Sequence, residues 1–124
     1  MFICLALLNS HFLYFYMKKN ILIYGELFEW AMAKNLSDSF INLGCNVHVF
    51  DYTNLLYRTR EYNIKNRILD RVLFYQVSKK INSEFLNYLG ANDFDLIIIL
   101  KGVHLFPETI EKLKSFTGLV VNWN

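Results

Sequence analysis

Residues 93–102 read Asp-Phe-Asp-Leu-Ile-Ile-Ile-Leu-Lys-Gly, and this stretch decides the fold class. Its centre, Leu96–Leu100, is apolar without interruption. A strand with one solvent-facing side alternates apolar and polar residues, whereas a central strand of a parallel sheet is apolar throughout, because helices cover both of its faces. We therefore predict an α/β protein in which this strand lies inside a parallel sheet.

Three shorter apolar runs predict further strands, at Ile21–Tyr24, Val47–Phe50 and Leu119–Val121. Strands that alternate with helical segments imply right-handed crossovers and a doubly wound, Rossmann-like sheet of about four strands. We favour the strand order 2-1-3-4, because the very apolar third strand should lie beside the first. Since the sequence ends directly after its fourth strand, we expect the sheet to be incomplete at its C-terminus.

Apolar residues spaced three or four apart predict the helices between these strands. One helix is expected over about 28–43, with Gly44 at a left-handed C-cap, and another over about 107–116, with proline at its first position. Residues 52–54 are expected to form a polar loop. From 69 to 89 an apolar residue recurs every four positions, which fits either one long curved helix or two joined helices.

Composition excludes several classes of protein. The chain has 124 residues, of which 54% are hydrophobic and 19% charged, so it is neither disordered nor collagen-like. Cys4 and Cys45 form neither a disulfide framework nor a zinc set, and no metal site is expected. A net charge of +2 without a recognised motif argues against nucleic acid as a partner. We expect a protein of the reducing cytoplasm.

Residues 1–16 form an apolar tail that is distinct from the domain expected over 17–124. A polar break at 9–11 makes the tail too short for a membrane span of about 20 residues. It also lacks the preceding basic residues of a signal peptide. Three interpretations stay open: an upstream start that does not belong to the protein, a weak membrane anchor, or an extra apolar element packed on the domain.

The candidate site residues follow the predicted strands, because ligands of open α/β sheets bind beyond the carboxyl ends of the strands. After the first strand only one glycine precedes Glu26, whereas a dinucleotide site needs a glycine-rich loop. The carboxylate would repel phosphate, so a hydroxyl-rich ligand that meets Glu26 and Trp30 fits better. Each candidate also has a purely structural interpretation as a turn residue, a strand-end acid or a surface histidine. The candidates are Gly25, Glu26, Asp51, Lys101, Gly102, His104 and Asn122.

Basic residues accumulate between 58 and 80, where the sequence has seven lysines and arginines but only two acids, Glu61 and Asp70. A basic amphipathic segment of this kind can contact an anionic membrane surface or a phosphorylated acceptor. The alternative is a solvated helix face. The residues expected to make a weak contact with the inner face of the membrane are Arg58, Arg60, Lys65, Arg67 and Arg71.

Six segments, taken in order, resemble a known family. They are Lys-Asn-Ile-Leu-Ile-Tyr-Gly at 19–25, the stretch 42–52, Phe-Leu-Asn-Tyr-Leu at 85–89, Phe-Asp-Leu-Ile-Ile-Ile-Leu-Lys-Gly at 94–102, Pro-Glu-Thr-Ile-Glu-Lys-Leu-Lys at 107–114 and Val-Val-Asn-Trp-Asn at 120–124. Together they resemble the N-terminal half of a GT-B glycosyltransferase, with the closest likeness to the CgeB-like, spore-maturation group.

The resemblance implies an acceptor-side domain. In GT-B enzymes the N-terminal domain shapes the acceptor site, and a C-terminal domain holds the nucleotide sugar. The resemblance therefore implies no cofactor in this domain, a missing C-terminal GT-B domain as its partner, a glycan or other hydroxyl acceptor, and a fragment that is inactive alone. Lys101 and Gly102 match the family pattern without an assigned catalytic role. The alternatives are a stand-alone flavodoxin-like or receiver-like binding or regulatory module, and a nonfunctional gene remnant.

Overall fold

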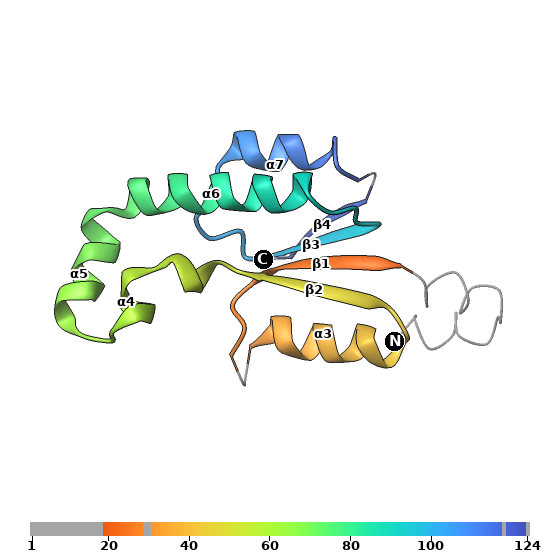
Figure 1. Ribbon diagram of the computed structural model, residues 1–124, viewed down its shortest axis with the longest axis horizontal. Helices are drawn as coiled ribbons and strands as arrows, with labels where there is room; N and C mark the ends of the chain where they lie inside the picture. Colours follow the sequence, from red (N-terminus) through yellow and green to blue (C-terminus); the bar gives the residue numbers. More distant parts are fainter. Residues whose placement is uncertain (1–18, 29–30, 118, 124) are drawn as a thin grey trace.

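Four parallel strands form the centre of the protein in the computed structural model, which describes residues 19–28, 31–117 and 119–123 (Figure 1). They are β1 (Asn20–Gly25), β2 (Asn46–Asp51), β3 (Leu96–Leu100) and β4 (Val120–Trp123), in the order β2-β1-β3-β4. The predicted fold class and strand order are confirmed. The apolar tail at 1–16 and Trp30 lie outside the described residues, so the predictions made for them stay predictions.

Each face of the sheet packs against its own set of helices. In Figure 1, α3 (Met32–Asn42) lies below the sheet, and α6 (Phe74–Gly90) and α7 (Pro107–Leu113) lie above it. Alternate residues of β1 enter the two cores: Leu22 and Tyr24 pack with Phe85 of α6, whereas Ile21 and Ile23 pack on the α3 side. Because both faces are covered, β1 and β3 are apolar on both sides.

The helix expected to begin at about Phe28 begins at Met32 instead. Ala31, whose backbone is extended, is the N-cap of the helix, and its N–H donates a hydrogen bond to the Phe28 carbonyl at 2.9 Å. Phe28 and Met32 are about half exposed, and the buried face of α3 begins at Ala33. The prediction for Gly44 is confirmed, since its φ of 86° is left-handed.

The prediction of a polar loop at 52–54 is wrong. Tyr52–Leu55 forms a 3₁₀ helix, η1, with Asp51 as its N-cap. This segment is held on the sheet because the buried Tyr52 ring stacks on the Tyr24 ring, with centroids 5.2 Å apart. The chain continues through α4 (Tyr57–Arg60) into α5 (Ile64–Val72). The apolar stripe of 69–89 is therefore two joined helices, α5 and α6, which meet at Leu73.

The last helix and strand are both displaced from their predicted limits. α7 ends at Leu113 rather than near Phe116, because the chain then turns through a hydrogen bond from Ser115 N–H to the Lys112 carbonyl at 3.0 Å. β4 begins one residue late and extends to Trp123, whose side chain is 52% exposed. Within the described ranges, no helix combines the length and the hydropathy needed to cross a membrane.

Candidate functional site

A pocket of ≈ 380 Å³ opens at the carboxyl ends of the strands. Figure 1 shows that α4 and α5 lie beyond this end of the sheet, so they form the outer wall of the pocket. The structure brings three of the sequence-predicted residues together here, since Glu26, Lys101 and His104 all line the pocket. Glu26 and Lys101 also line a smaller adjoining pocket of ≈ 160 Å³ on the α3 side.

Glu26 is held in place by Tyr52. The Tyr52 hydroxyl donates a hydrogen bond of 2.5 Å to Glu26 Oε1, and both residues line both pockets. Burial, and then the neighbouring Glu26 carboxylate, raise the pKa of the Tyr52 hydroxyl, so Tyr52 stays protonated and keeps donating. One carboxylate oxygen is therefore occupied, and among the described residues no hydrogen bond engages the other.

The turn after β3 has an unusual backbone. Lys101 and His104 have φ values of 64° and 69°, and Gly102 between them has φ 60°. Side chains other than glycine occupy this left-handed region at a cost of about 1–2 kcal/mol, so the surrounding structure must hold the turn. One hydrogen bond that holds the turn comes from the buried Tyr24, whose hydroxyl donates to the Val103 carbonyl at 2.5 Å.

Two buried polar residues of α6 supply the other hydrogen bonds. Asn82 Nδ2 donates to the His104 carbonyl at 2.7 Å, and Asn82 Oδ1 accepts from the Phe106 N–H at 3.0 Å. Ser78 Oγ shares a hydrogen bond of 2.7 Å with His104 Nδ1. The His104 ring also stacks on Phe74, with centroids 4.5 Å apart. The imidazole is therefore fixed from two sides, while its turn is fixed by Asn82.

His104 is neutral at pH 7. Burial lowers its pKa below the ordinary 6.5, the positive charge of Arg58 lowers it further, and Asp70 acts in the opposite direction. A neutral imidazole offers one ring nitrogen as donor and the other as acceptor. Since Ser78 engages Nδ1, the remaining nitrogen is the group that His104 can offer to a ligand.

The lowered pKa predicts a pH-dependent stability. In the unfolded chain His104 takes up a proton as the pH falls through about 6.5, but in the folded chain it does so only at lower pH. The contribution of neutral His104 to the free energy of unfolding is therefore complete above pH 6.5, and it is lost as the pH falls towards the pKa of His104 in the folded chain. Denaturant titrations between pH 5 and 8 should show a steeper loss of unfolding free energy for the wild type than for His104→Asn, which tolerates the left-handed backbone. Parallel curves would contradict the neutral His104.

Asp70 serves the outer wall of the pocket rather than the ligand. It is nearly buried, and its carboxylate accepts hydrogen bonds from the N–H groups of Tyr57 at 2.7 Å and Arg58 at 3.1 Å. These are the first residues of α4, whose own N-cap residue, Leu56, makes no side-chain cap. Asp70 thereby fixes α4 to α5 and satisfies its free N–H groups.

The structure does not bring the other sequence-predicted residues to the pocket wall. Asp51 caps η1, with its Oδ1 accepting from the Thr53 N–H at 3.0 Å. Gly25 is buried, and a side chain there would meet Ala33 and Leu100 at 3.3 Å. Gly102 shapes the turn through its positive φ, and Asn122 lies on β4 in register with Ile99. Whether these residues contact a ligand stays a prediction.

Sequence reasoning missed five residues of the site. Ser78 and Asn82 were hidden in the apolar stripe, although polar residues beside Val77 and Ile81 on a buried helix face were a usable signal. Tyr52 was assigned to a loop. The contributions of Asp70 and Phe74 could not be read from the chain, because they depend on how α5 packs against α4 and how the start of α6 meets the turn after β3. The missed residues are Tyr52, Asp70, Phe74, Ser78 and Asn82.

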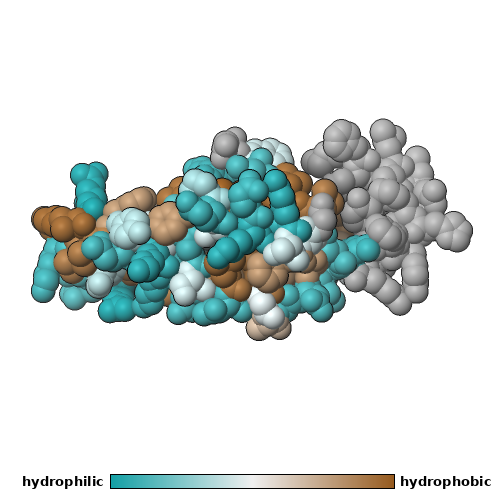
Figure 2. Space-filling view, turned by 90° about the horizontal axis from the view of Figure 1, so that it is seen from above, coloured by the Kyte–Doolittle hydropathy of each residue, from teal (hydrophilic) through white to brown (hydrophobic). Residues whose placement is uncertain are grey.

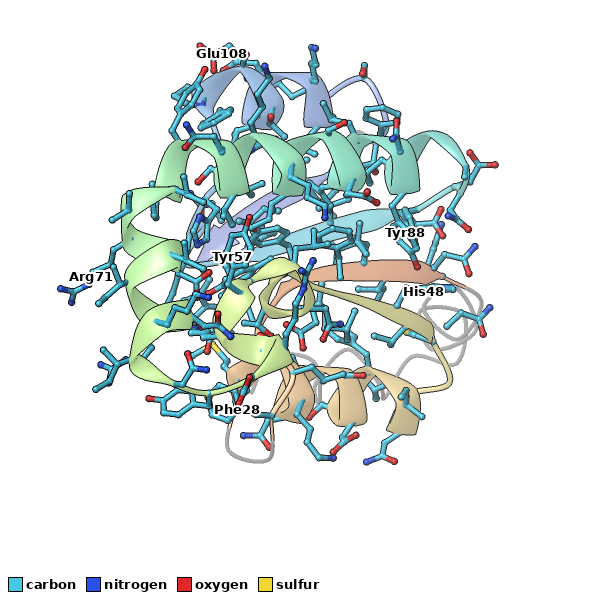
Figure 3. The ribbon with its side chains drawn as sticks, turned by 60° about the vertical axis from the view of Figure 1, so that its left-hand side comes forward. Phe28, His48, Tyr57, Arg71, Tyr88 and Glu108 are labelled. Carbon is cyan, nitrogen blue, oxygen red and sulfur yellow. The ribbon has the colours of Figure 1, made fainter. Side chains whose placement is uncertain are left out.

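A further hydrogen-bonded pair of side chains lies towards the opposite end of the sheet. Figure 3 places His48 and Tyr88 there, away from Arg71, and the Tyr88 hydroxyl and His48 Nδ1 share a hydrogen bond of 3.1 Å. Among the residues that the structure describes, no three His, Cys, Asp or Glu side chains gather as metal ligands would.

The fold and the site together define a class: a Rossmann-like α/β protein with a polar pocket at the carboxyl ends of its parallel strands. Comparison of the chain with protein-family models, with curated proteins and with solved structures found no significant match. The function must therefore be argued from the pocket itself and from the resemblance of the sequence segments.

Proposed function

We propose that this chain is the acceptor-side, N-terminal-type domain of a cytoplasmic GT-B glycosyltransferase, which transfers a glycosyl group from a nucleotide sugar to a glycan or another hydroxyl acceptor. The observation that carries the proposal is the pocket where Glu26, Tyr52, Lys101 and His104 meet. It combines hydrogen-bond acceptors and donors with the aromatic face of Phe74, as polyhydroxylated ligands require.

Within this proposal each side chain has a distinct task. Glu26, fixed through one oxygen by Tyr52, accepts a hydrogen bond from an acceptor hydroxyl with the other. Lys101 donates to a second ligand oxygen, and the free ring nitrogen of neutral His104 meets a third polar group. These contacts bind and orient the acceptor, and no catalytic role is assigned to them.

We place the nucleotide sugar in a second α/β domain that faces this one. The loop after β1 supports that placement, because it puts the Glu26 carboxylate where a glycine-rich loop would hold a pyrophosphate. The enzyme would then bind its acceptor with this domain and its donor with the other. On this proposal the chain alone holds an acceptor but transfers nothing.

The test is ligand-observed NMR on the chain itself. With methyl glucoside and methyl N-acetylglucosaminide, saturation transfer should be seen with the wild type. With Glu26→Ala the affinity for these glycosides should fall by roughly tenfold, and the saturation transfer should weaken with it, because a hydrogen bond to a charged group is lost. Glu84→Ala, an exposed acid of α6 outside the pocket, is the matched control and should behave as wild type. Equal loss in both variants, or strong saturation of uridine, would contradict the proposal.

We also propose a weak contact of α4 and α5 with an anionic membrane surface. Supporting it, Arg58, Arg60, Lys65, Arg67 and Arg71 are all exposed, and Glu61 is the single exposed acid of the segment 57–72. Each basic residue near such a surface contributes about 1 kcal/mol. Sedimentation with phosphatidylglycerol vesicles should therefore decrease with the double variant Arg60→Glu, Lys65→Glu. The double variant Lys112→Glu, Lys114→Glu serves as the control, and an equal decrease there would contradict the contact.

A further inference from the structure

Three depressions that share lining residues follow one another from the α3 side of the strand ends to α5, and together they are called the groove here. The pocket on the α3 side shares Glu26, Tyr52 and Lys101 with the central pocket. At its other end, the central pocket shares Arg67 and Arg71 with an outer depression of ≈ 150 Å³ on α5. The groove therefore runs from the α3 side past the Glu26 carboxylate to the arginines of α5 and on to the outer depression.

The α5 end of the groove has an excess of positive charge. Arg58, Arg67, Arg71 and Lys101 line the central pocket, whose acids are Glu26 and Asp70. The Asp70 carboxylate is already engaged by two backbone N–H groups and lies 4.0 Å from Arg58 Nε.

The remaining cations have no carboxylate partner among the described residues. In the described part of the chain, no acidic group lies within 4.0 Å of the charged ends of Arg67, Arg71 or Lys101. The Arg67 guanidinium rests 5.7 Å from the centre of the Tyr62 ring, and Figure 3 shows Arg71 extending from α5 into solvent. These side chains suit an anionic group, which arginine binds through two parallel hydrogen bonds.

Beyond the arginines the groove becomes apolar. The outer depression is lined by Ile64 and Ile68, which are 73% and 54% exposed, together with the two arginines. Val72, one turn further along α5, is 71% exposed. Figure 2 shows hydrophobic side chains beside hydrophilic ones at the end of the molecule where α5 lies. An exposed isoleucine pair beside exposed arginines is the pattern expected for an anionic amphiphile.

We infer that the groove binds an amphiphile in which a hydroxylated headgroup is joined through a phosphoryl group to an apolar chain. The headgroup hydroxyls lie at Glu26, the phosphoryl oxygens at Lys101 and Arg67 with Arg71 closing from outside, and the apolar chain over Ile64 and Ile68. This inference rests on the proposed function and names the chemical class of its acceptor: a hydroxyl-bearing phospholipid or lipid-linked sugar phosphate. From Glu26 outward to α5, the groups along the groove are acidic, then cationic, then apolar, which is the order of groups along such a molecule.

Calorimetric titrations of the full chain with four probes measure the contributions of the three parts of the groove: the carboxylate, the cations and the isoleucines. Dihexanoyl phosphatidylinositol, below its micellar concentration, carries a hydroxylated ring, a phosphodiester and apolar chains. Glucose 1-phosphate lacks the chains, octyl glucoside lacks the phosphoryl group, and inorganic phosphate lacks both sugar and chain. We expect the phosphatidylinositol probe to bind roughly tenfold more tightly than either glucose derivative, and inorganic phosphate to bind most weakly.

Double variants show which part of the groove binds which part of each probe. Arg67→Ala with Arg71→Ala should weaken both organic phosphoryl probes by roughly tenfold or more and leave octyl glucoside unchanged. The control is Lys79→Ala with Lys80→Ala, which removes the same charge from exposed positions of α6 outside the groove. Ile64→Ser with Ile68→Ser should weaken the two probes that carry chains and leave glucose 1-phosphate unchanged.

Each contrary outcome overturns a stated part. Octyl glucoside binding as tightly as the phosphatidylinositol probe would overturn the phosphoryl site. Glucose 1-phosphate binding as tightly would overturn the lipid and identify a soluble phosphate ester as the ligand. If the arginine pair controls binding but Glu26→Ala changes nothing, the phosphoryl site stands and the proposed acceptor function fails. If Glu26→Ala weakens the glucosides and the arginine pair changes nothing, the acceptor function stands and this inference fails.

Discussion

Replacing Phe85 by alanine is expected to lower the free energy of unfolding by about 3–5 kcal/mol, the largest effect of any single change considered. Phe85 is fully buried between α6 and the sheet, and its ring centroid lies 5.0 Å from those of both Tyr24 and Phe50. Truncation removes the transfer free energy of the ring and leaves a cavity that these neighbours fill only partly. Chemical denaturation monitored by far-ultraviolet circular dichroism measures the loss.

Two further variants keep this prediction testable, because a domain of this size has only about 5–15 kcal/mol to lose. Phe85→Leu refills part of the cavity and should lose a smaller amount, about 1–2 kcal/mol. Tyr62→Ala removes an aromatic ring that is 75% exposed and should cost less than about 1 kcal/mol. A Phe85→Leu variant no less stable than Tyr62→Ala would show that the core between α6 and the sheet does not depend on the Phe85 ring.

The fold could be predicted because its determinants are local in the sequence. The run Leu96–Leu100 identified a strand covered on both faces, and its apolarity placed it beside β1. Gly44 and Pro107 marked a helix end and a helix start through their own backbone constraints. The limits of α3 and α7 were less accurate, because they depend on which residues reach the core rather than on the spacing alone.

The site was predictable only in part, because it is built from contacts between distant segments. Glu26, Lys101 and His104 follow strands whose carboxyl ends share one edge, so the parallel topology alone brings them together. Asn82 and Asp70 act on backbone groups 12 to 24 positions away in the chain. No periodicity shows such pairings, although a polar residue on a buried helix face indicates that some partner must exist.

The basic segment gained a different meaning in the structure. In the sequence it resembles one amphipathic stripe, but the structure divides it among α4, α5 and α6, and Arg58, Arg67 and Arg71 are among the residues that line the pocket with Glu26. Because that arrangement places cations beside the pocket, the proposed ligand binding and the proposed membrane contact would share one surface. Arg60 and Lys65 lie outside the groove lining, so they can test the membrane contact separately.

Asn82→Ala is expected to disrupt the turn that carries His104 and to lower the free energy of unfolding by about 2–4 kcal/mol. The side chain is 4% exposed, and it holds the His104 carbonyl at 2.7 Å and the Phe106 N–H at 3.0 Å. Alanine leaves both backbone groups without these partners in a shielded position, which costs about 1–3 kcal/mol for each group. The left-handed residue His104 then loses a hydrogen bond that holds its strained backbone.

Native-state hydrogen exchange distinguishes this local effect from a general loss of stability. In Asn82→Ala the amide of Phe106 should exchange at least tenfold faster, beyond the acceleration that the lower global stability causes in the β1 and β3 amides. Asn87→Ala, which removes the same amide group from an exposed position of α6, should change neither the stability by more than about 0.5 kcal/mol nor the exchange at Phe106. If both alanine variants behave alike, the turn is held by Tyr24 and Ser78 alone, and the positioning of His104 does not depend on Asn82.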